Sequence, residues 1–145
     1  MGKNKLRLMI IDDDEINNFI LIRLIKETGV SIICNSALNG QKALKKLERW
    51  HRNGGIDFPD IILLDLEMPV MDGFAFLERY EKLFFNYYPH VQLYMVSSSI
   101  RTEDRSRAKS FVSVSNFISK PLPITALMEI IDQYKLTATV SRVGS

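Results

Sequence analysis

The chain has 145 residues, a length that fits one globular domain able to bury a hydrophobic core. Hydrophobic residues make up 46% of the chain and charged residues 25%, and the formal net charge of +2 leaves no electrostatic footprint for nucleic acid. No apolar run reaches the length of a membrane span and no secretory signal precedes the first apolar run. The single cysteine, Cys34, excludes an internal disulfide, so we expect a cytoplasmic protein with no membrane or direct nucleic-acid contact.

Short apolar runs alternate with amphipathic stretches along the whole chain, which predicts alternating strands and helices. In chain order these are strand 6–11, helix 15–28, strand 31–34, helix 41–50, strand 61–64, a helix from about 73, strand 91–96, a helix beginning at 103–104 behind a Thr102 cap, strand 116–118 and helix 124–134. Five such units predict an α/β fold with a mainly parallel sheet and helices on both faces. We expect one domain over residues 1–135 and a disordered tail over residues 136–145.

Charged and hydroxyl side chains follow four of the predicted strands directly. Asp12–Asp14 follow the first strand, Asp65 the third, Ser97–Ser99 the fourth, and Lys120 the fifth. Because the carboxyl ends of parallel strands meet at one edge of a sheet, these side chains are expected to share that edge.

Carboxylates that gather at one edge repel each other unless a cation lies between them. Mg²⁺ binds carboxylate and carbonyl oxygens together with waters and phosphate oxygens, and a carboxylate can act as a nucleophile toward a phosphoryl group. The pattern therefore indicates a metal-assisted phosphoryl site with Lys120 as a second positive charge. Each of these residues, taken alone, could also have an ordinary structural role in a cap, turn or loop. Asp14 is expected to be the N-cap of the first helix.

Three segments carry a resemblance to a known family: "MIIDDDE", "PDIILLDLEMPVMDG" and "FISKPL". In this order they resemble the receiver domain of response regulators in bacterial two-component signalling, in the stand-alone form of chemotaxis regulators. The resemblance covers roughly residues 5–134. It implies a doubly wound, flavodoxin-like sheet of five parallel strands in the order 2-1-3-4-5, and often a cis peptide bond between Lys120 and Pro121.

The resemblance also assigns roles to individual residues. Asp65 is the implied phosphoacceptor, with Ser97 and Lys120 binding the phosphoryl group. The implied ligands of Mg²⁺ (or Mn²⁺) are Asp12, chiefly through water, Asp13, Asp65 and the backbone carbonyl of Glu67. Ser97 and Phe117 are the implied switch residues that move inward on activation. Ser98 replaces the usual smaller residue after the switch hydroxyl, and is expected to slow access to Asp65.

The resemblance implies a phosphoprotein that takes a phosphoryl group from a sensor histidine kinase or a histidine phosphotransfer protein. Phosphorylation would then change the surface of the fourth helix, fifth strand and fifth helix, and so control a downstream target protein. We expect a monomer or a phosphorylation-dependent dimer. The protein would catalyse its own phosphorylation and dephosphorylation without being a turnover enzyme.

Two other functions fit parts of the pattern. A Mg²⁺-dependent aspartyl phosphatase would use a similar carboxylate, but its D-x-D-x-[TV] motif follows the first strand, where this chain has Asp-Asp-Asp. A receiver-like binding module that works without phosphorylation is the other alternative. The presence of the complete set of acids together with Ser97 and Lys120 favours a function that depends on phosphorylation.

Overall fold

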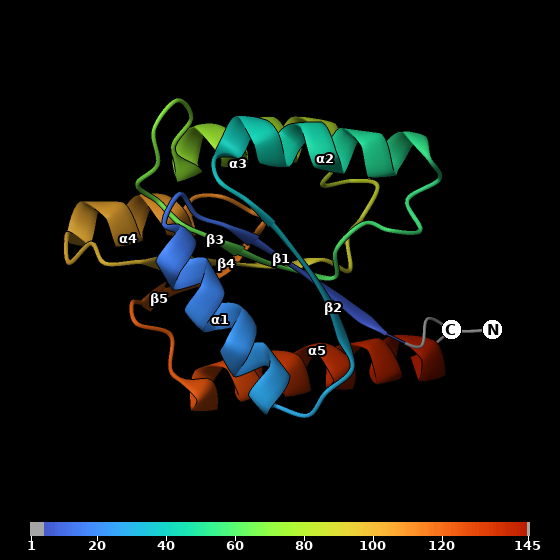
Figure 1. Cartoon of the computed structure of the whole chain (residues 1–145). Coiled ribbons are helices and arrows are strands. Elements are labelled where there is room, and N and C mark those ends of the chain that lie inside the picture. Colours follow the sequence, from blue (N-terminus) through green and yellow to red (C-terminus); the bar gives the residue numbers. More distant parts are fainter. Residues whose placement is uncertain (1–4, 145) are drawn as a thin grey trace.

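A computed structural model describes the backbone of residues 5–144 and the side chains of residues 5–138. Strands and helices alternate along the chain (Figure 1). In chain order they are β1 (Leu6–Ile11), α1 (Glu15–Glu27), β2 (Ile32–Ala37), α2 (Gly40–Arg52), β3 (Ile61–Leu64), α3 (Gly73–Leu83), β4 (Gln92–Ser97), α4 (Thr102–Lys109), β5 (Val114–Ser119) and α5 (Ile124–Gly144).

The five strands form one parallel sheet in the order β2-β1-β3-β4-β5. The predicted fold class and strand order are therefore confirmed. β1 and β3 are neighbours in the sheet although a strand and two helices separate them in the sequence, and Ile11 is paired with Leu64. This register places the residues that follow the two strands, Asp12 and Asp65, side by side.

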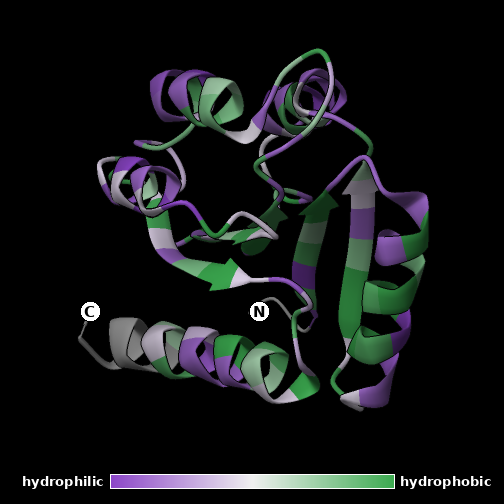
Figure 2. Ribbon diagram, turned by 90° about the vertical axis from the view of Figure 1, so that its left-hand side faces the viewer, coloured by the Kyte–Doolittle hydropathy of each residue, from purple (hydrophilic) through white to green (hydrophobic). Residues whose placement is uncertain are grey.

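Alternating side chains of β1 supply two hydrophobic cores, one on each face of the sheet. Met9 and Ile11 point to the face covered by α2, α3 and α4, where they join Leu47, Phe74 and Ala108. Leu8 and Ile10 point to the opposite face, where α1 and α5 pack. Figures 1 and 2 show these two helical layers, with the hydrophobic colour concentrated on the strands between them.

Short polar side chains fix the beginnings of three helices. Asp14 accepts hydrogen bonds from the backbone amides of Ile16 and Asn17, which confirms it as the N-cap of α1. Asn39 and Asp72 cap α2 and α3 in the same way. Since Asp14 and Asp72 end the loops after β1 and β3, these caps also hold in place the loops that carry the acidic residues.

Two predicted details differ from the structure. Thr102 was expected to cap α4, but the N-cap position is Arg101, which makes no side-chain cap, and the Arg101 amide donates instead to the hydroxyl of Ser99. The sequence predicts that helix α5 ends near Tyr134, but it continues to Gly144. No glycine or proline interrupts the sequence between Pro123 and Gly144, so nothing in it stops the helix earlier.

The two loops at the opposite end of the sheet from the acidic residues pack on each other. Tyr88 stacks on Phe58 with ring centroids 3.7 Å apart, and its hydroxyl lies 2.6 Å from Nδ1 of His51. The loop around Gly55 and the segment after α3 therefore form one aromatic cluster. None of the helices within the described chain is both long enough and apolar enough to span a bilayer.

Candidate functional site

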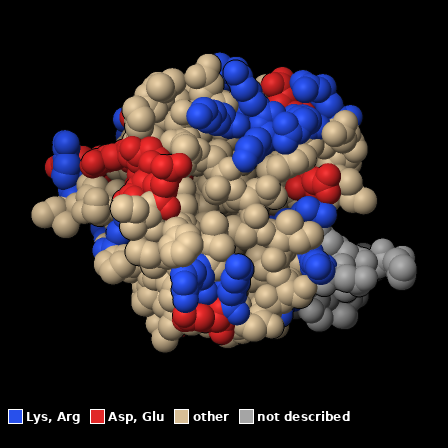
Figure 3. All heavy atoms as spheres, in the orientation of Figure 1, with Lys and Arg blue, Asp and Glu red and all other residues tan. Residues whose placement is uncertain are grey.

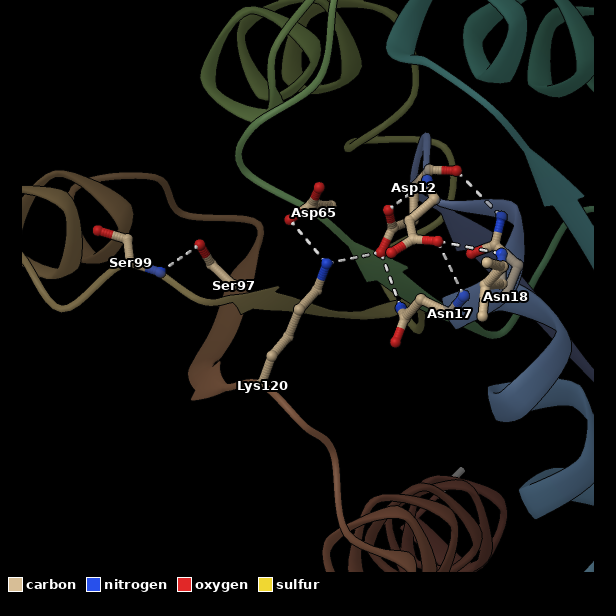
Figure 4. Close-up of polar contacts among 9 residues, drawn as sticks. Asp12, Asn17, Asn18, Asp65, Ser97, Ser99 and Lys120 are labelled. Atoms are coloured by element: carbon tan, nitrogen blue, oxygen red, sulfur yellow. Dashed lines mark hydrogen bonds and ion pairs between the residues drawn. The ribbon is translucent and has the colours of Figure 1, made fainter.

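The carboxyl ends of β1, β3 and β5 bring Asp12, Asp65 and Lys120 together (Figure 4). Carboxylate oxygens of Asp12, Asp13 and Asp65 all lie within 4.8 Å of one another. Asp12 and Asp65 are buried, with 3% and 7% of their surface exposed, whereas Asp13 is exposed. Figure 3 shows acidic side chains gathered on the side of the molecule where α1 begins, while Lys and Arg side chains gather over α2.

Lys120 is the positive charge that links two of these carboxylates. Its ammonium Nζ lies 2.8 Å from Oδ2 of Asp12 and 3.3 Å from Oδ1 of Asp65. Burial alone would lower the pKa of Lys120, but its hydrogen bond to Asp12 and the charge of Asp65 outweigh burial and raise the pKa. Lys120 is therefore held in its charged form between the two acids. The peptide bond that follows it, to Pro121, is cis as expected.

The environment of Asp65 makes its carboxyl group harder to ionise than usual. Burial first, and then the charge of Asp12, raise the pKa of Asp65, Lys120 opposes both, and the resulting pKa is about 6 instead of an ordinary 3.8. A single ammonium thus does not balance the negative charge at this edge. The backbone of Asp65 is held in place, because its amide donates a hydrogen bond to the carbonyl of Ile11 at 2.8 Å.

The donor set fits a hard divalent cation such as Mg²⁺. It consists of carboxylate oxygens at converging positions, two of them buried and one exposed to solvent, which leaves room for waters in the coordination shell. Asp13 and Glu67 also line one cleft of about 580 Å³, which extends toward α4. Asp12, Asp13 and Asp65 would hold the ion, and Glu67 lies in the loop after β3 where its carbonyl is expected to contribute.

Ser97, the predicted switch hydroxyl, is buried at the end of β4. Its Oγ accepts a hydrogen bond from the amide of Ser99 at 3.1 Å and is turned toward that residue (Figure 4). The Ser99 hydroxyl in turn donates to Asp104 of α4 at 2.5 Å. Ser98, by contrast, is exposed. The β4–α4 loop is therefore tied to helix α4 by hydroxyl groups.

Phe117, the predicted switch aromatic, is already buried in β5, with 7% of its surface exposed. The guanidinium carbon of Arg105 lies 4.8 Å from the centroid of its ring, and Arg105 also donates to the hydroxyl of Ser119 at 2.6 Å. The structure thus combines an inward Phe117 with a Ser97 hydroxyl that bonds its own loop.

Two asparagines in the first turns of α1 also contact Asp12, and sequence analysis missed them. The Asn17 side-chain amide donates to Oδ2 of Asp12 at 2.9 Å, and the Asn18 side-chain amide donates to the Asp12 carbonyl at 3.0 Å. Asn18 is buried, and its own Oδ1 lies without a hydrogen-bond partner among the described residues. The sequence feature that could have indicated these contacts is the pair of asparagines in the helix that directly follows Asp12–Asp14.

The chain matches the family described as "Response regulator receiver domain" over residues 8–132. It is 31% identical over 131 residues to hybrid signal transduction histidine kinase L of Dictyostelium discoideum, covering 88% of this chain and 7% of that protein. It is also 31% identical over 114 residues to sensor histidine kinase CheAY of Helicobacter pylori, covering 79% of this chain and 13% of that protein. The chain thus spans a small part of these relatives.

Solved structures share the same fold. A crystal structure of a two-component response regulator from Cytophaga hutchinsonii superposes with a TM-score of 0.80 at 27% identity, over 92% of this chain and 98% of that one. The structure of a CheX–CheY–BeF₃–Mg²⁺ complex from Borrelia burgdorferi gives a TM-score of 0.70 at 22% identity, over 92% and 89% of the two chains. The second likeness supports the fold alone.

Proposed function

The chain belongs to the response regulator receiver domain family, and from this we propose that it accepts a phosphoryl group on Asp65 and changes its α4–β5–α5 surface in response. The donor would be a sensor histidine kinase or a histidine phosphotransfer protein. A downstream protein would read the changed surface.

One observation carries the proposal most strongly: the ammonium of Lys120 lies within 3.3 Å of both Asp12 and Asp65, where three carboxylates converge. A phosphoryl group bound to Asp65 would add about two negative charges at this point. Lys120 is the protein group already placed to neutralise them. Positioning and charge neutralisation are most of what phosphoryl transfer requires of a protein.

In the transfer, a carboxylate oxygen of Asp65 attacks the phosphorus of a phosphohistidine. The P–O bond of an acyl phosphate forms, the P–N bond breaks, and the histidine nitrogen keeps the electron pair of that bond. When bound, Mg²⁺ would neutralise negative charge on the transferring group. Asp12 and Asp13 would hold the ion, while the buried backbone of Asp65 fixes the direction of attack.

The response would pass through Ser97 and α4. The Ser97 hydroxyl oxygen now accepts a hydrogen bond from the amide of Ser99. To donate its proton to a phosphoryl oxygen on Asp65, the Ser97 side chain would turn toward Asp65 and leave the Ser99 amide. Because Ser99 also bonds Asp104 of α4, a movement of this loop would displace the start of the helix. Phe117 is already inward, so in this chain the change is expected at the loop and α4 more than at the aromatic ring.

We propose that the protein is a phosphoacceptor without turnover of external substrates. A receiver-like module that binds its partners without phosphorylation is the alternative, and it gains no support from a site in which the acids and the lysine contact each other. The phosphorylation-dependent dimer and the cytoplasmic location belong to the same proposal.

Mass spectrometry after incubation with acetyl phosphate and Mg²⁺ tests the function. The wild type should gain the mass of one phosphoryl group, and peptide mapping after borohydride reduction should place it on Asp65. The Asp65→Asn and Asp13→Ala variants should gain none. Steady release of phosphate from p-nitrophenyl phosphate would instead support a phosphatase, and signalling by Asp65→Asn equal to the wild type would support the binding module.

A further inference from the structure

We propose that Asn17 is a positioning residue that holds Asp12 in place when Lys120 leaves it for the phosphoryl group. This inference rests on the proposed function, because it concerns the same site in its phosphorylated state. It assigns a role to a residue outside the acids, Ser97 and Lys120.

The two oxygens of Asp12 are held differently. Oδ1 accepts a hydrogen bond from the backbone amide of Asp14 at 2.9 Å. Oδ2 accepts two, from Nζ of Lys120 at 2.8 Å and from the side-chain amide of Asn17 at 2.9 Å (Figure 4). Asp12 is 3% exposed, so water can replace a lost donor only poorly. Each donor to Oδ2 therefore matters.

Lys120 is the donor that phosphorylation would remove. It is already shared, because its Nζ lies 3.3 Å from Asp65 as well. A phosphoryl group on Asp65 carries more negative charge than the carboxylate of Asp12 and would draw the ammonium toward itself. Asp12 would then lose its ammonium partner, and its position would depend on the cation and on its remaining hydrogen-bond donors.

Asn17 cannot move with Lys120, because both its backbone amide and its side chain are held by hydrogen bonds at the start of α1. Its backbone amide donates to Oδ1 of Asp14 at 3.1 Å, inside the N-cap of α1. Its side chain reaches back to Asp12 from the same turn. As a neutral amide it also has little attraction to an added phosphoryl charge. Asn17 thus stays on Oδ2 in both states and keeps the carboxylate oriented toward the cation site.

This role predicts an asymmetry between the two ligands of the site. With Mg²⁺ alone, Lys120 still holds Asp12, so loss of the Asn17 amide should weaken Mg²⁺ binding by at most about threefold. With BeF₃⁻ standing in for the phosphoryl group, Lys120 is drawn away and Asn17 is the remaining side-chain donor. Loss of a hydrogen bond to a charged group should then weaken BeF₃⁻ binding by about tenfold or more.

The test is a pair of NMR titrations on the wild type and Asn17→Leu, which has a similar size and no donor. Amide shifts are followed first with Mg²⁺ and then with BeF₃⁻ at saturating Mg²⁺. Asn86→Leu makes the same chemical change in an exposed turn after α3 and should match the wild type in both. Asn17→Ala is titrated in parallel, so that the result does not depend on how leucine packs.

If the Asn17 variants bind Mg²⁺ and BeF₃⁻ more weakly by the same factor, the loop is displaced and the proposal is overturned. Unchanged binding of BeF₃⁻ in these variants would overturn it as well. If BeF₃⁻ and Mg²⁺ leave the wild type itself unperturbed, the proposed function fails and the role of Asn17 with it. If they perturb the wild type and Asn17→Leu identically, only the inference about Asn17 fails.

Discussion

Gly73 and Asp65 approach each other so closely that no larger residue fits at position 73. A β-carbon built on Gly73 would lie 2.7 Å from the carbonyl oxygen of Asp65 and 3.0 Å from Cα of Leu66. Both obstacles are backbone atoms, so neither can move aside without moving the strand end that carries Asp65. The glycine of "MDG" is therefore part of the geometry of the site.

Gly73→Ala should consequently weaken both stability and function. Overpacking against backbone is expected to lower the free energy of unfolding by about 1–3 kcal/mol, measured by urea denaturation. Phosphorylation of Asp65 by acetyl phosphate should fall in the same variant. Gly29→Ala is the control: its φ of +72° makes alanine strained by about 1 kcal/mol, but it lies away from the site and should leave phosphorylation unchanged. A stable, fully active Gly73→Ala protein would contradict the structure at this loop.

The strands and the acidic edge were predictable from sequence because both follow from short-range patterns. Buried strands such as residues 61–64 are runs of aliphatic residues, and the topology of a parallel sheet then brings Asp12 and Asp65 together without further information. The motif around Asp65 also indicated that a helix begins at about residue 73, where α3 begins. Periodicity, together with the strand order that the family resemblance implies, was sufficient for these features.

Side-chain directions could not be predicted in the same way. The donors from Asn17 and Asn18 depend on how the first turn of α1 faces the acidic loop, and no hydrophobic pattern records that. Phe117 packs in the hydrophobic core and also contacts Arg105 of α4, and the sequence of β5 alone indicates neither contact. The N-cap position of α4 is Arg101 and not Thr102, and the Arg101 amide donates to the hydroxyl of Ser99, a loop contact that the sequence pattern does not record.

Replacement of Asp65 by asparagine should stabilise the protein in the absence of divalent metal, and the effect should depend on pH. The pKa of Asp65 is raised to about 6 in the folded state from an ordinary 3.8. The folded wild type therefore binds a proton more tightly than the unfolded chain, and its stability falls as pH rises between these values. Asparagine does not titrate, so its advantage should be near zero below pH 4 and reach about 2–3 kcal/mol above pH 6.

Urea denaturation of both proteins from pH 4 to 8 in EDTA measures this difference. Asp132→Asn, which removes an exposed carboxylate on α5, should stay within about 0.5 kcal/mol of the wild type at every pH. Added Mg²⁺ should stabilise the wild type more than Asp65→Asn, because it neutralises the carboxylate. A pH-independent difference between the two proteins would rule out the ionisation of Asp65 as its origin.

Val70 is strained in the folded protein. It is the one non-glycine residue of the described chain with a positive φ, +71°, and a β-branched side chain disfavours that conformation. Its side chain is also 80% exposed, so burial offers little compensation. Val70→Gly should therefore raise the free energy of unfolding by about 0.5–1 kcal/mol, as strain relief exceeds the added backbone entropy.

Val112→Gly provides the matched control for that change. Val112 is 69% exposed in the loop before β5 but has no positive φ, so glycine there should lower stability by up to about 1 kcal/mol. Opposite signs for the two substitutions in thermal or urea unfolding would support strain at Val70. The same sign in both would mean that the loop after β3 relaxes without strain.

Arg105 should control how firmly α4 is held against the sheet. Within α4 only Ala108 is buried, so the helix has little hydrophobic anchoring of its own. Arg105 adds a cation–π contact with Phe117 and a hydrogen bond to Ser119 of β5. An exposed contact of this kind contributes about 0.5–1 kcal/mol, so Arg105→Ala should speed amide hydrogen exchange in residues 102–109 by about two- to fivefold. Lys109→Ala, a change of an exposed residue on the same helix, should leave exchange as in the wild type.

Since the proposed switch moves α4, the loosened helix of Arg105→Ala should also respond to a lower concentration of BeF₃⁻ than the helix of the wild type. Exchange rates equal to the wild type would instead show that α4 is held by Ala108 and the hydroxyls of its preceding loop.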